Sequence, residues 1–535
     1  MILSIAFKEF YNNLVSARFT IGFLLCLLLI PFTMIVSIND YSSQVRAYDM
    51  ENKQADENTK QVRVYSALRP EIVRPPEPLS IFSRGVSYQV GNRVKIQFGE
   101  LPLLAGGRSS VRENPLLNAF FSLDFSTVIA IIMSLLALLF TYDSCTGERE
   151  QGTLRLVFVG SIRRSTVLLG KVIGIFLTLV PIILFCYAMS ALIILFHPAV
   201  SFSFAEWIRI GLMFLLSLLF LALFMALGLF VSSRVRLSST SIIVCLFLWV
   251  AFMFVVPNAA VYTVKSFIKT GSQENLRSTL DEVNGDYEKK YSELSESVRE
   301  KIQPDWFMHW NMNSFGDGYL ELTGSSRSLF LFYLELQKQA EPLRIEYADR
   351  KWPVQKTYLD KLDRQRKYAE LLGLLSPSGI FRQAVSSLCR TDVPAHYRFL
   401  NIVREYREEL IQFFRDKKIF ESYEYFTRQD PSTFMTADEI VRTRTGGQFQ
   451  TLQEYGAWAN EHNGDFSPLW KVDIPGTNLW QYKPLDLSNV PQFHWAPSSV
   501  MGDLKQSIFK LAILALGCII LFYLSFVSFA RYDVR

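Results

Sequence analysis

The side chains best suited to chemistry lie in one short stretch, Tyr142–Lys171, between two long apolar runs. Its charged and flexible positions are Glu148, Arg149, Glu150, Gly152, Arg163, Arg164 and Lys171. Such side chains make charge-assisted hydrogen bonds to another protein more readily than they enclose a small ligand. A solvated loop would carry similar charges, so the residue types alone leave docking of a partner and an ordinary loop as alternatives.

No other constellation in the sequence predicts catalysis. A Walker A loop ends in Gly-Lys followed by a Ser or Thr that holds magnesium. Here Val172 follows Gly170-Lys171, and Ser165 stands where the first glycine of the motif would be. The histidines show no metal-ligand spacing, and no Gly-x-Ser-x-Gly elbow occurs. We therefore expect no catalytic, cofactor-binding or metal-binding residues, and no ATP hydrolysis by this chain alone.

Long apolar runs decide the fold class. Half of the 535 residues are hydrophobic, and they are concentrated in runs that are nearly free of charge. About 20 apolar residues are needed to cross the hydrocarbon core of a bilayer. The six runs are Phe19–Ile38, Phe125–Tyr142, Val172–Phe196, Ile208–Val231, Thr240–Val256 and Ile508–Phe529. They predict an α-helical polytopic membrane protein with six transmembrane helices, because the buried helices of a soluble core are rarely apolar over such lengths.

Lysine and arginine in the short loops predict the orientation, because cytoplasmic loops are enriched in these residues. Both termini are expected in the cytoplasm. The expected order is 1–18, a cytoplasmic amphipathic helix; 19–38, the first span; 39–115, a small outer segment; 116–142, the second span with its outer lead-in; 143–171, a cytoplasmic coupling loop; 172–196, 208–231 and 240–256, the next three spans; 258–505, a large outer domain; 508–529, the last span; and 530–535, a cytoplasmic tail. Asp124, Asp143 and Arg209 stand at span ends and are interpreted as interfacial anchors. Since the basic residues follow this topology and form no stripe, nucleic-acid binding is not expected.

Apolar periodicity predicts a mainly helical large outer domain and a smaller α+β outer segment. The expected helices are Tyr41–Val62, Asn275–Ile302 with a break near Gly285, Ser326–Leu375 with breaks near Pro342 and Pro353, and His396–Phe420. Alternation in Val86–Val90 and Val94–Phe98, on either side of Gly91-Asn92, predicts a hairpin. The region Tyr425–Ser499 is rich in Trp, Pro, Asn and Gly and is expected to be loop with a few strands.

Three features together resemble the permease subunits of ABC transporters of the ABC-2 type. They are the start Ala6-Phe7-Lys8-Glu9-Phe10 with Arg18-Phe19, the six-span layout, and the loop pattern Glu148-Arg149-Glu150-Gln151-Gly152-Thr153-Leu154, Arg163-Arg164-Ser165 and Gly170-Lys171. The segment from Leu375-Ser376-Pro377 through Phe381-Arg382-Gln383-Ala384 to Thr391-Asp392 is similar to the branch with a large insert between the fifth and sixth spans. That branch often has glycine before the Thr-Asp pair, whereas this chain has Arg390.

The resemblance implies a permease subunit of an ATP-driven exporter in the bacterial plasma (inner) membrane. It would work as a dimer with an identical or sister permease, surrounded by membrane lipid, and with separate ABC ATPase subunits. The chain would bind no cofactor itself, because ATP and magnesium would sit on the ATPase. The residues expected to dock the ATPase are Glu148, Arg149, Glu150, Gly152, Thr153, Leu154, Arg163, Arg164, Gly170 and Lys171.

Two other functions fit the same sequence. The complex could be a mechanotransmitter that uses ATP to drive a periplasmic partner without moving cargo, which the helical outer domain and the scarcity of polar residues in the spans favour. Alternatively, the chain could be a membrane-anchored outer enzyme whose Trp-rich region, Tyr425–Ser499, binds a glycan or peptide.

Overall fold

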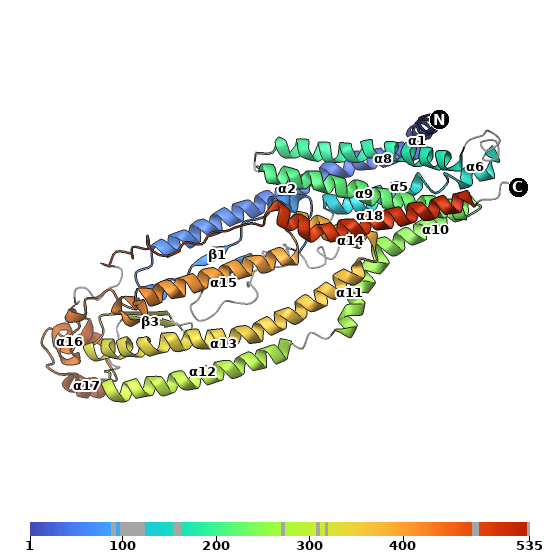
Figure 1. Ribbon diagram of the computed structural model, residues 1–535. Helices are drawn as coiled ribbons and strands as arrows, with labels where there is room; N and C mark the ends of the chain where they lie inside the picture. The colour runs from blue at the N-terminus through green and yellow to red at the C-terminus, as the bar shows by residue number, and fades with distance from the viewer. Residues whose placement is uncertain are drawn as a thin grey trace.

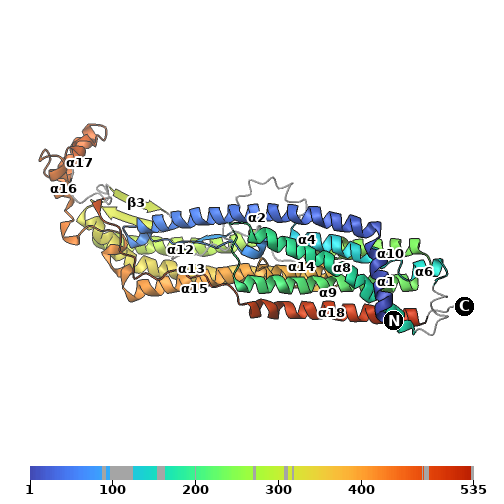
Figure 2. The same cartoon turned by 90° about the horizontal axis from the view of Figure 1, so that it is seen from above.

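The chain forms an elongated, mainly helical molecule in this computed structural model (Figure 1). The structure describes residues 1–86, 92–96, 124–153, 163–198, 200–268, 273–305, 311–315, 319–472, 474 and 481–531. One half is a bundle of apolar helices, and both chain termini lie at its free end, called here the terminal end. The other half, called here the distal half, projects away from the bundle as long polar helices (Figure 2).

Five helical segments of the described residues are long and apolar enough to cross a membrane. They are α2 (Ala17–Lys60), α8 (Arg164–Leu195), α9 (Phe204–Arg234), the continuous α10 (Ser238–Val250), η4 (Ala251–Val255) and α11 (Val256–Phe267), and α18 (Val500–Ala530). The predicted second span is a shorter apolar helix made of α4 (Phe125–Val128), the π-helical turn η3 (Ile129–Met133) and α5 (Ser134–Leu139). An α-helical polytopic membrane protein is therefore confirmed, and the short helix lies buried among the long ones.

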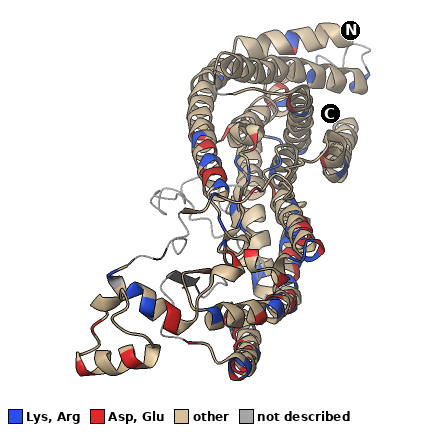
Figure 3. Cartoon of the chain, turned by 90° about the vertical axis from the view of Figure 1, so that its left-hand side faces the viewer, with Lys and Arg blue, Asp and Glu red and all other residues tan. Residues whose placement is uncertain are grey.

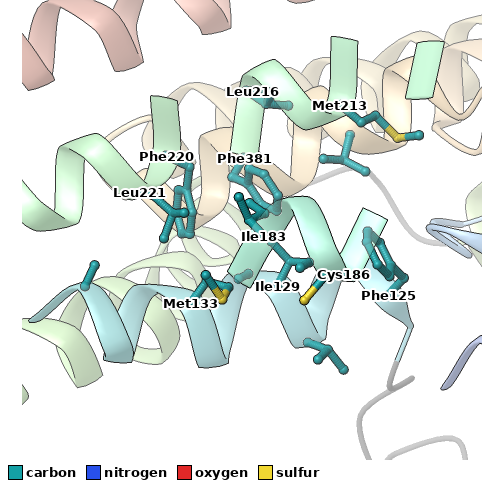
Figure 4. Packing of buried hydrophobic residues seen from close by; sticks show 14 of the residues in the cluster. Phe125, Ile129, Met133, Ile183, Cys186, Met213, Leu216, Phe220, Leu221 and Phe381 are labelled. Atoms are coloured by element: carbon teal, nitrogen blue, oxygen red, sulfur yellow. The ribbon is translucent and has the colours of Figure 1, made fainter. Parts of the chain in front are cut away.

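The bundle core contains one helix from the predicted outer domain. This helix, α14 (Pro377–Leu388), packs on α9 and α18. The ring of its Phe381 stacks on the ring of Phe220, with 4.6 Å between the ring centroids (Figure 4). The hydroxyl of Ser378 donates to the carbonyl of Phe252, 2.7 Å away, and Ser376 donates to the same oxygen. Phe252 lies in the π-helical turn η4, where regular helical hydrogen bonding is interrupted. Part of the 258–505 region is thus built into the bundle.

The distal half is made of long helices that lie side by side. They are α12 (Gln273–Ile302), α13 (Arg327–Gly373), α15 (Val393–Asp416) and the second half of α2. The hairpin of β3 (Asn311–Phe315) and β4 (Tyr319–Thr323) lies beside them, and α16 (Ala437–Arg444) and α17 (Leu452–Glu461) form the far tip around a small apolar core of their own. Charged side chains crowd the distal helices, whereas the bundle helices are almost uncharged (Figure 3). This division follows from the cost of placing charges in hydrocarbon.

Several expectations about the distal half were wrong. The expected breaks are absent: α12 runs through Gly285, α13 runs through Pro342 and Pro353, and the predicted helix Tyr41–Val62 is the continuation of α2. Packing along neighbouring helices compensates for the backbone hydrogen bond that each proline removes. The shorter turns of the chain are η1 (Tyr65–Ala67), η2 (Pro78–Ile81), η6 (Ile419–Glu421), η7 (Tyr423–Tyr425), η8 (Pro431–Thr433) and η9 (Ser467–Trp470).

The strand predictions also need correction. The strand β2 (Arg93–Lys95) pairs antiparallel with β1 (Glu71–Val73), with Ile72 opposite Val94, a pairing that the sequence did not predict. The predicted partner was the strand Val86–Val90. Most of that predicted strand, residues 87–90, lies outside the described residues. Between 425 and 499 the described residues form α16, α17 and short turns but no strands. Trp458 packs there against Phe449.

Candidate docking site

The predicted docking cluster lies on α6 (Thr146–Glu150), a one-turn helix at the terminal end of the bundle (Figure 1). Gly152 follows it with φ 69°, in the left-handed region that favours glycine, so the chain turns sharply there. Glu150, Gly152 and Thr153 are exposed and form a free edge. Leu154 belongs to residues 154–162, which lie outside the described part of the chain.

Lys171 is a buried cation early in α8. Its Nζ lies 2.7 Å from Glu9 Oε1 of α1 (Ile2–Leu14) and 2.9 Å from Glu148 Oε1 of α6, and its side chain is 2% exposed. A buried ammonium is strongly destabilising unless carboxylates compensate its charge. The two ion pairs therefore hold α1, α6 and α8 together. We call Glu9, Glu148 and Lys171 the lysine junction.

The other two charged residues of α6 attach it to the end of α9 and to the start of α10. Arg149 Nη1 donates to the carbonyl of Val235 at 2.8 Å. The Glu150 carboxylate accepts from the backbone N–H of Ser238 at 2.9 Å and from its hydroxyl at 2.8 Å, which caps the first turn of α10. Both hydrogen bonds lower the pKa of Glu150, and the bond from the backbone N–H has the larger effect. All three charged residues of α6 thus have partners within the chain.

Gly170 serves close packing of helices. A Cβ at Gly170 would lie 2.8 Å from the Cβ of Ile5, and one at Gly174 would lie 2.6 Å from the carbonyl oxygen of Ala6. Only glycine at these two positions, one turn apart, lets α1 cross α8 at this distance. Glu9 of α1 is thereby brought within reach of Lys171.

A second ion pair at the terminal end joins α2 to the start of the loop. Arg18 Nη2 lies 2.8 Å from Asp143 Oδ2, and the same guanidinium donates to the carbonyl of Leu139 and the hydroxyl of Tyr142. Asp143 was interpreted from the sequence as an interfacial anchor. In the structure it also forms an ion pair with Arg18. Sequence reasoning missed Arg18 and Glu9 as site residues, because no spacing rule pairs them with positions so far along the chain.

The remaining predicted residues lie on the rim of the same region. Thr153 Oγ1 donates to the carbonyl of Glu148 at 3.2 Å, Arg163 is exposed, and Arg164 donates to the carbonyl of Ala530 at the end of α18. A small apolar cluster, Cys145, Val167, Leu168 and Phe529, lies beneath them. Burial raises the pKa of the Cys145 thiol to about 11, so this cysteine is not a thiolate nucleophile near neutral pH.

The contacts of α6 join it to several neighbouring elements. Among the described residues, no group of three or more His, Cys, Asp or Glu side chains could hold a metal ion. What the site offers is a short helix with one exposed end, at Glu150, that is fastened to bundle helices by ion pairs and hydrogen bonds. A force applied to α6 would therefore reach those helices directly.

Comparison with known proteins shows the family of the chain. A family model described as "ABC-2 family transporter protein" matches residues 3–534, so the chain belongs to the ABC-2 transporter family, as its resemblance implied. The chain is also 31% identical over 133 residues to the "Probable ABC transporter permease protein NosY" of Stutzerimonas stutzeri. That match covers 25% of this chain and 48% of the relative, so the chain spans about half the length of that protein.

Proposed function

We propose that the chain is the membrane-spanning permease subunit of an ATP-driven ABC transporter that works as an exporter. Two permease chains, identical or sister, would form the membrane core, and separate ATPase subunits would carry ATP and magnesium. Membership in the ABC-2 family and the similarity to NosY, a probable ABC transporter permease protein, support the permease role. The single observation that carries the mechanism is the lysine junction, which fastens the exposed α6 to the bundle.

Coupling would begin when an ATPase subunit presses on the free edge of α6. Movement of α6 would pull α8 and α1 through Lys171 and would pull α10 through Glu150 and Ser238. Separating buried ion pairs leaves unpaired charges in a poorly solvated place, which is costly. The joined helices would therefore move as one unit, and this movement would open the interface between the two permease chains.

The expected location is a bacterial plasma membrane with both termini in the cytoplasm. Both termini lie at the same end of the bundle as α6, which supports this topology (Figure 1). Leu3, Phe7 and Tyr11 are exposed at four-residue spacing along α1, as expected for a helix that lies in the lipid interface. We propose that this stripe contacts membrane lipid.

Purification of the tagged chain from its host in mild detergent tests the docking role. We expect a soluble protein with a Walker A motif to co-purify, and Thr153→Trp to lower its yield by about tenfold because a bulky ring obstructs the α6 edge. The matched control is Thr279→Trp on α12, another exposed threonine, but in the distal half. An unchanged yield with Thr153→Trp would remove α6 from the docking surface, and absence of any ATPase would contradict the transporter proposal.

Mechanotransmission is the second candidate, and α2 favours it. This helix is 44 residues long without interruption, which corresponds to about 66 Å at 1.5 Å per residue. It begins beside α1 at the terminal end and continues into the distal half. A rod of this length could carry movement to a periplasmic partner. Transport of cargo by the reconstituted complex, with no such partner present, would contradict this alternative.

A further inference from the structure

Six charged side chains meet at the end of the bundle opposite to α6. We call them the arginine cluster: Arg74, Glu77, Glu206, Arg209, Arg390 and Asp503. They come from four separate places in the chain. Arg74 and Glu77 lie in the segment after α2, Glu206 and Arg209 near the start of α9, Arg390 directly after α14, and Asp503 in the first turn of α18.

Arg390 is at the centre of the cluster. Its guanidinium lies 3.4 Å from Glu77, 3.8 Å from Glu206 and 3.6 Å from Asp503, and Arg209 pairs with the same Asp503 at 2.8 Å. Arg74 pairs with Glu77 at 3.5 Å and donates to the backbone carbonyl of Arg390 at 3.3 Å. With three cations and three anions, the cluster has no net formal charge, which is how buried charges are tolerated.

The backbone of Arg390 is strained. Its φ is 57°, in the left-handed region that side chains other than glycine rarely adopt. A residue kept in such a conformation persists only when the surrounding contacts favour it. At Arg390, those contacts are ion pairs to three carboxylates on three different segments. The left-handed backbone alone would favour glycine at this position. The ion pairs of the side chain therefore explain why the residue is arginine.

The cluster also contains unsatisfied groups. Arg209 is fully buried, yet its Nε and Nη1 have no hydrogen-bond partner within the part of the chain that the structure describes. Asp503 is shared between two arginines: its Oδ2 lies 2.8 Å from Arg209 and 3.6 Å from Arg390. Buried donors without partners are costly, and a second arrangement in which the carboxylates exchange arginines would lower that cost if it gave them partners. A cluster with two arrangements can pass movement from one side to the other.

We propose that the arginine cluster is the joint through which movement of the bundle reaches the distal half, with Arg390 as its positioning residue. Asp503 and Arg209 belong to bundle helices. Arg74 and Glu77 lie between β1, whose Ile72 belongs to the apolar core of the distal half, and η2, whose Leu79 belongs to the bundle core. Arg74 also lies over the ring of Trp495, 5.7 Å from its centroid, in the chain that leads from the distal half into α18. The role of this joint rests on the proposed function, because the ATPase would supply the movement.

Hydrogen exchange of the whole permease–ATPase complex in lipid nanodiscs tests the joint. In the wild type we expect a non-hydrolysable ATP analogue to change the exchange rates across residues 64–82 by about tenfold, which is within the range typical of coupling between two sites. Arg390→Gly keeps the backbone shape and removes the ion pairs, so the nucleotide-linked change should disappear while ATPase activity stays. Arg390→Lys should retain part of the change, which guards against loss through misfolding.

The control is Lys418→Gly, because Lys418 also has a left-handed backbone, with φ 54°, but is exposed. It should behave as the wild type does. If Arg390→Gly keeps the nucleotide-linked change, or if an active wild-type complex shows none in residues 64–82, the joint is overturned. Failure to recover any ATPase activity would instead overturn the proposed function, so the two failures are distinguishable.

Discussion

At the scale of the residue, Lys171 shows how one buried charge can organise a site. Sequence reasoning placed it at the basic end of a docking loop, where it would be solvated. In the structure it is buried between Glu9 and Glu148, and its ammonium group holds α1, α6 and α8 together through two ion pairs. The docking role of its neighbours on the exposed edge stays a prediction.

Replacement of this lysine should be costly. We expect Lys171→Met to lower the free energy of unfolding by about 3–5 kcal/mol, because two partly buried carboxylates lose their counter-charge. The apparent melting temperature of the purified chain in detergent measures this loss. Arg163→Met, an exposed basic residue near the same loop, is the matched control and should change little. Equal melting temperatures for the two variants would show that the lysine junction contributes nothing to stability.

His396 predicts a pH dependence. It is buried in α15, and burial together with the nearby charge of Arg74 lowers its pKa from 6.5 to about 4. The unfolded chain therefore binds a proton that the folded chain does not. Stability should be fully present above about pH 6.5 and should fall by on the order of 3 kcal/mol as the pH approaches 4.

Melting temperatures measured between pH 7 and pH 4 test this dependence. His396→Gln should flatten the part of the profile that this histidine causes, whereas His494→Gln, at an exposed histidine, should not. A wild-type slope that persists unchanged in His396→Gln would assign the dependence to other groups.

At the scale of the element, the crossing of α1 over α8 is decided by two glycines. Amphipathicity predicted that residues 1–18 lie along the membrane surface, and the structure shows a helix over Ile2–Leu14 with one apolar stripe exposed. Its other face rests on Gly170 and Gly174. Because the crossing point positions Glu9, this helix contact and the lysine junction depend on each other.

Gly174→Leu should separate the two helices. The new side chain would meet the backbone oxygen of Ala6, which cannot rotate away, so we expect a loss of about 1–3 kcal/mol from overpacking. Gly211→Leu on α9 is the matched control, because nothing lies within 4 Å of the Cβ that it would add. Thermal stability in detergent distinguishes the two, and a neutral Gly174→Leu would mean that α1 does not approach α8 closely.

At the scale of the whole molecule, two charged joints lie at opposite ends of one apolar bundle. The lysine junction is at the terminal end, and the arginine cluster lies where the bundle meets the distal half. The long α2 runs from one region into the other, and its continuity was missed because the apolar and polar parts were treated as separate elements. The ion pair between Arg18 and Asp143 connects α2, which runs through Pro31, to the loop that carries α6.

Ala47→Pro tests whether the rigidity of α2 matters. Proline at this exposed position should remove a backbone hydrogen bond and kink the helix, which would lower the free energy of unfolding by about 3 kcal/mol. We expect co-purification of the ATPase to persist while ATP-dependent transport, or the response of an external partner, is lost. Ala17→Pro, at the first position of the same helix, is the control because proline is tolerated there. Full activity of Ala47→Pro would show that α2 need not be a continuous rod.

The features that the sequence predicted correctly are those that depend on residues close together in the chain. The apolar runs indicated the membrane helices, and the three-to-four periodicity indicated α12 and α15, because both signals lie within one stretch of chain. The breaks expected at Pro342 and Pro353 were wrong because neighbouring helices outweigh a local cost. The resemblance that pointed to the ABC-2 family was also local, since short motifs around Glu148 and Phe381 carried it, and the family match confirmed it.

The amino-acid order thus decides that this is a helical membrane protein of the ABC-2 family and which loop carries the charged motif. Tertiary structure alone decides which charges meet. Lys171 finds Glu9, Arg18 finds Asp143, and Arg390 finds three carboxylates, and each pair is separated by a long stretch of chain. The energy of an ion pair depends on the distance between charges and on their burial, and neither quantity is encoded in spacing along the chain. The short second helix and the entry of α14 into the bundle core have the same cause, because packing against distant helices sets both.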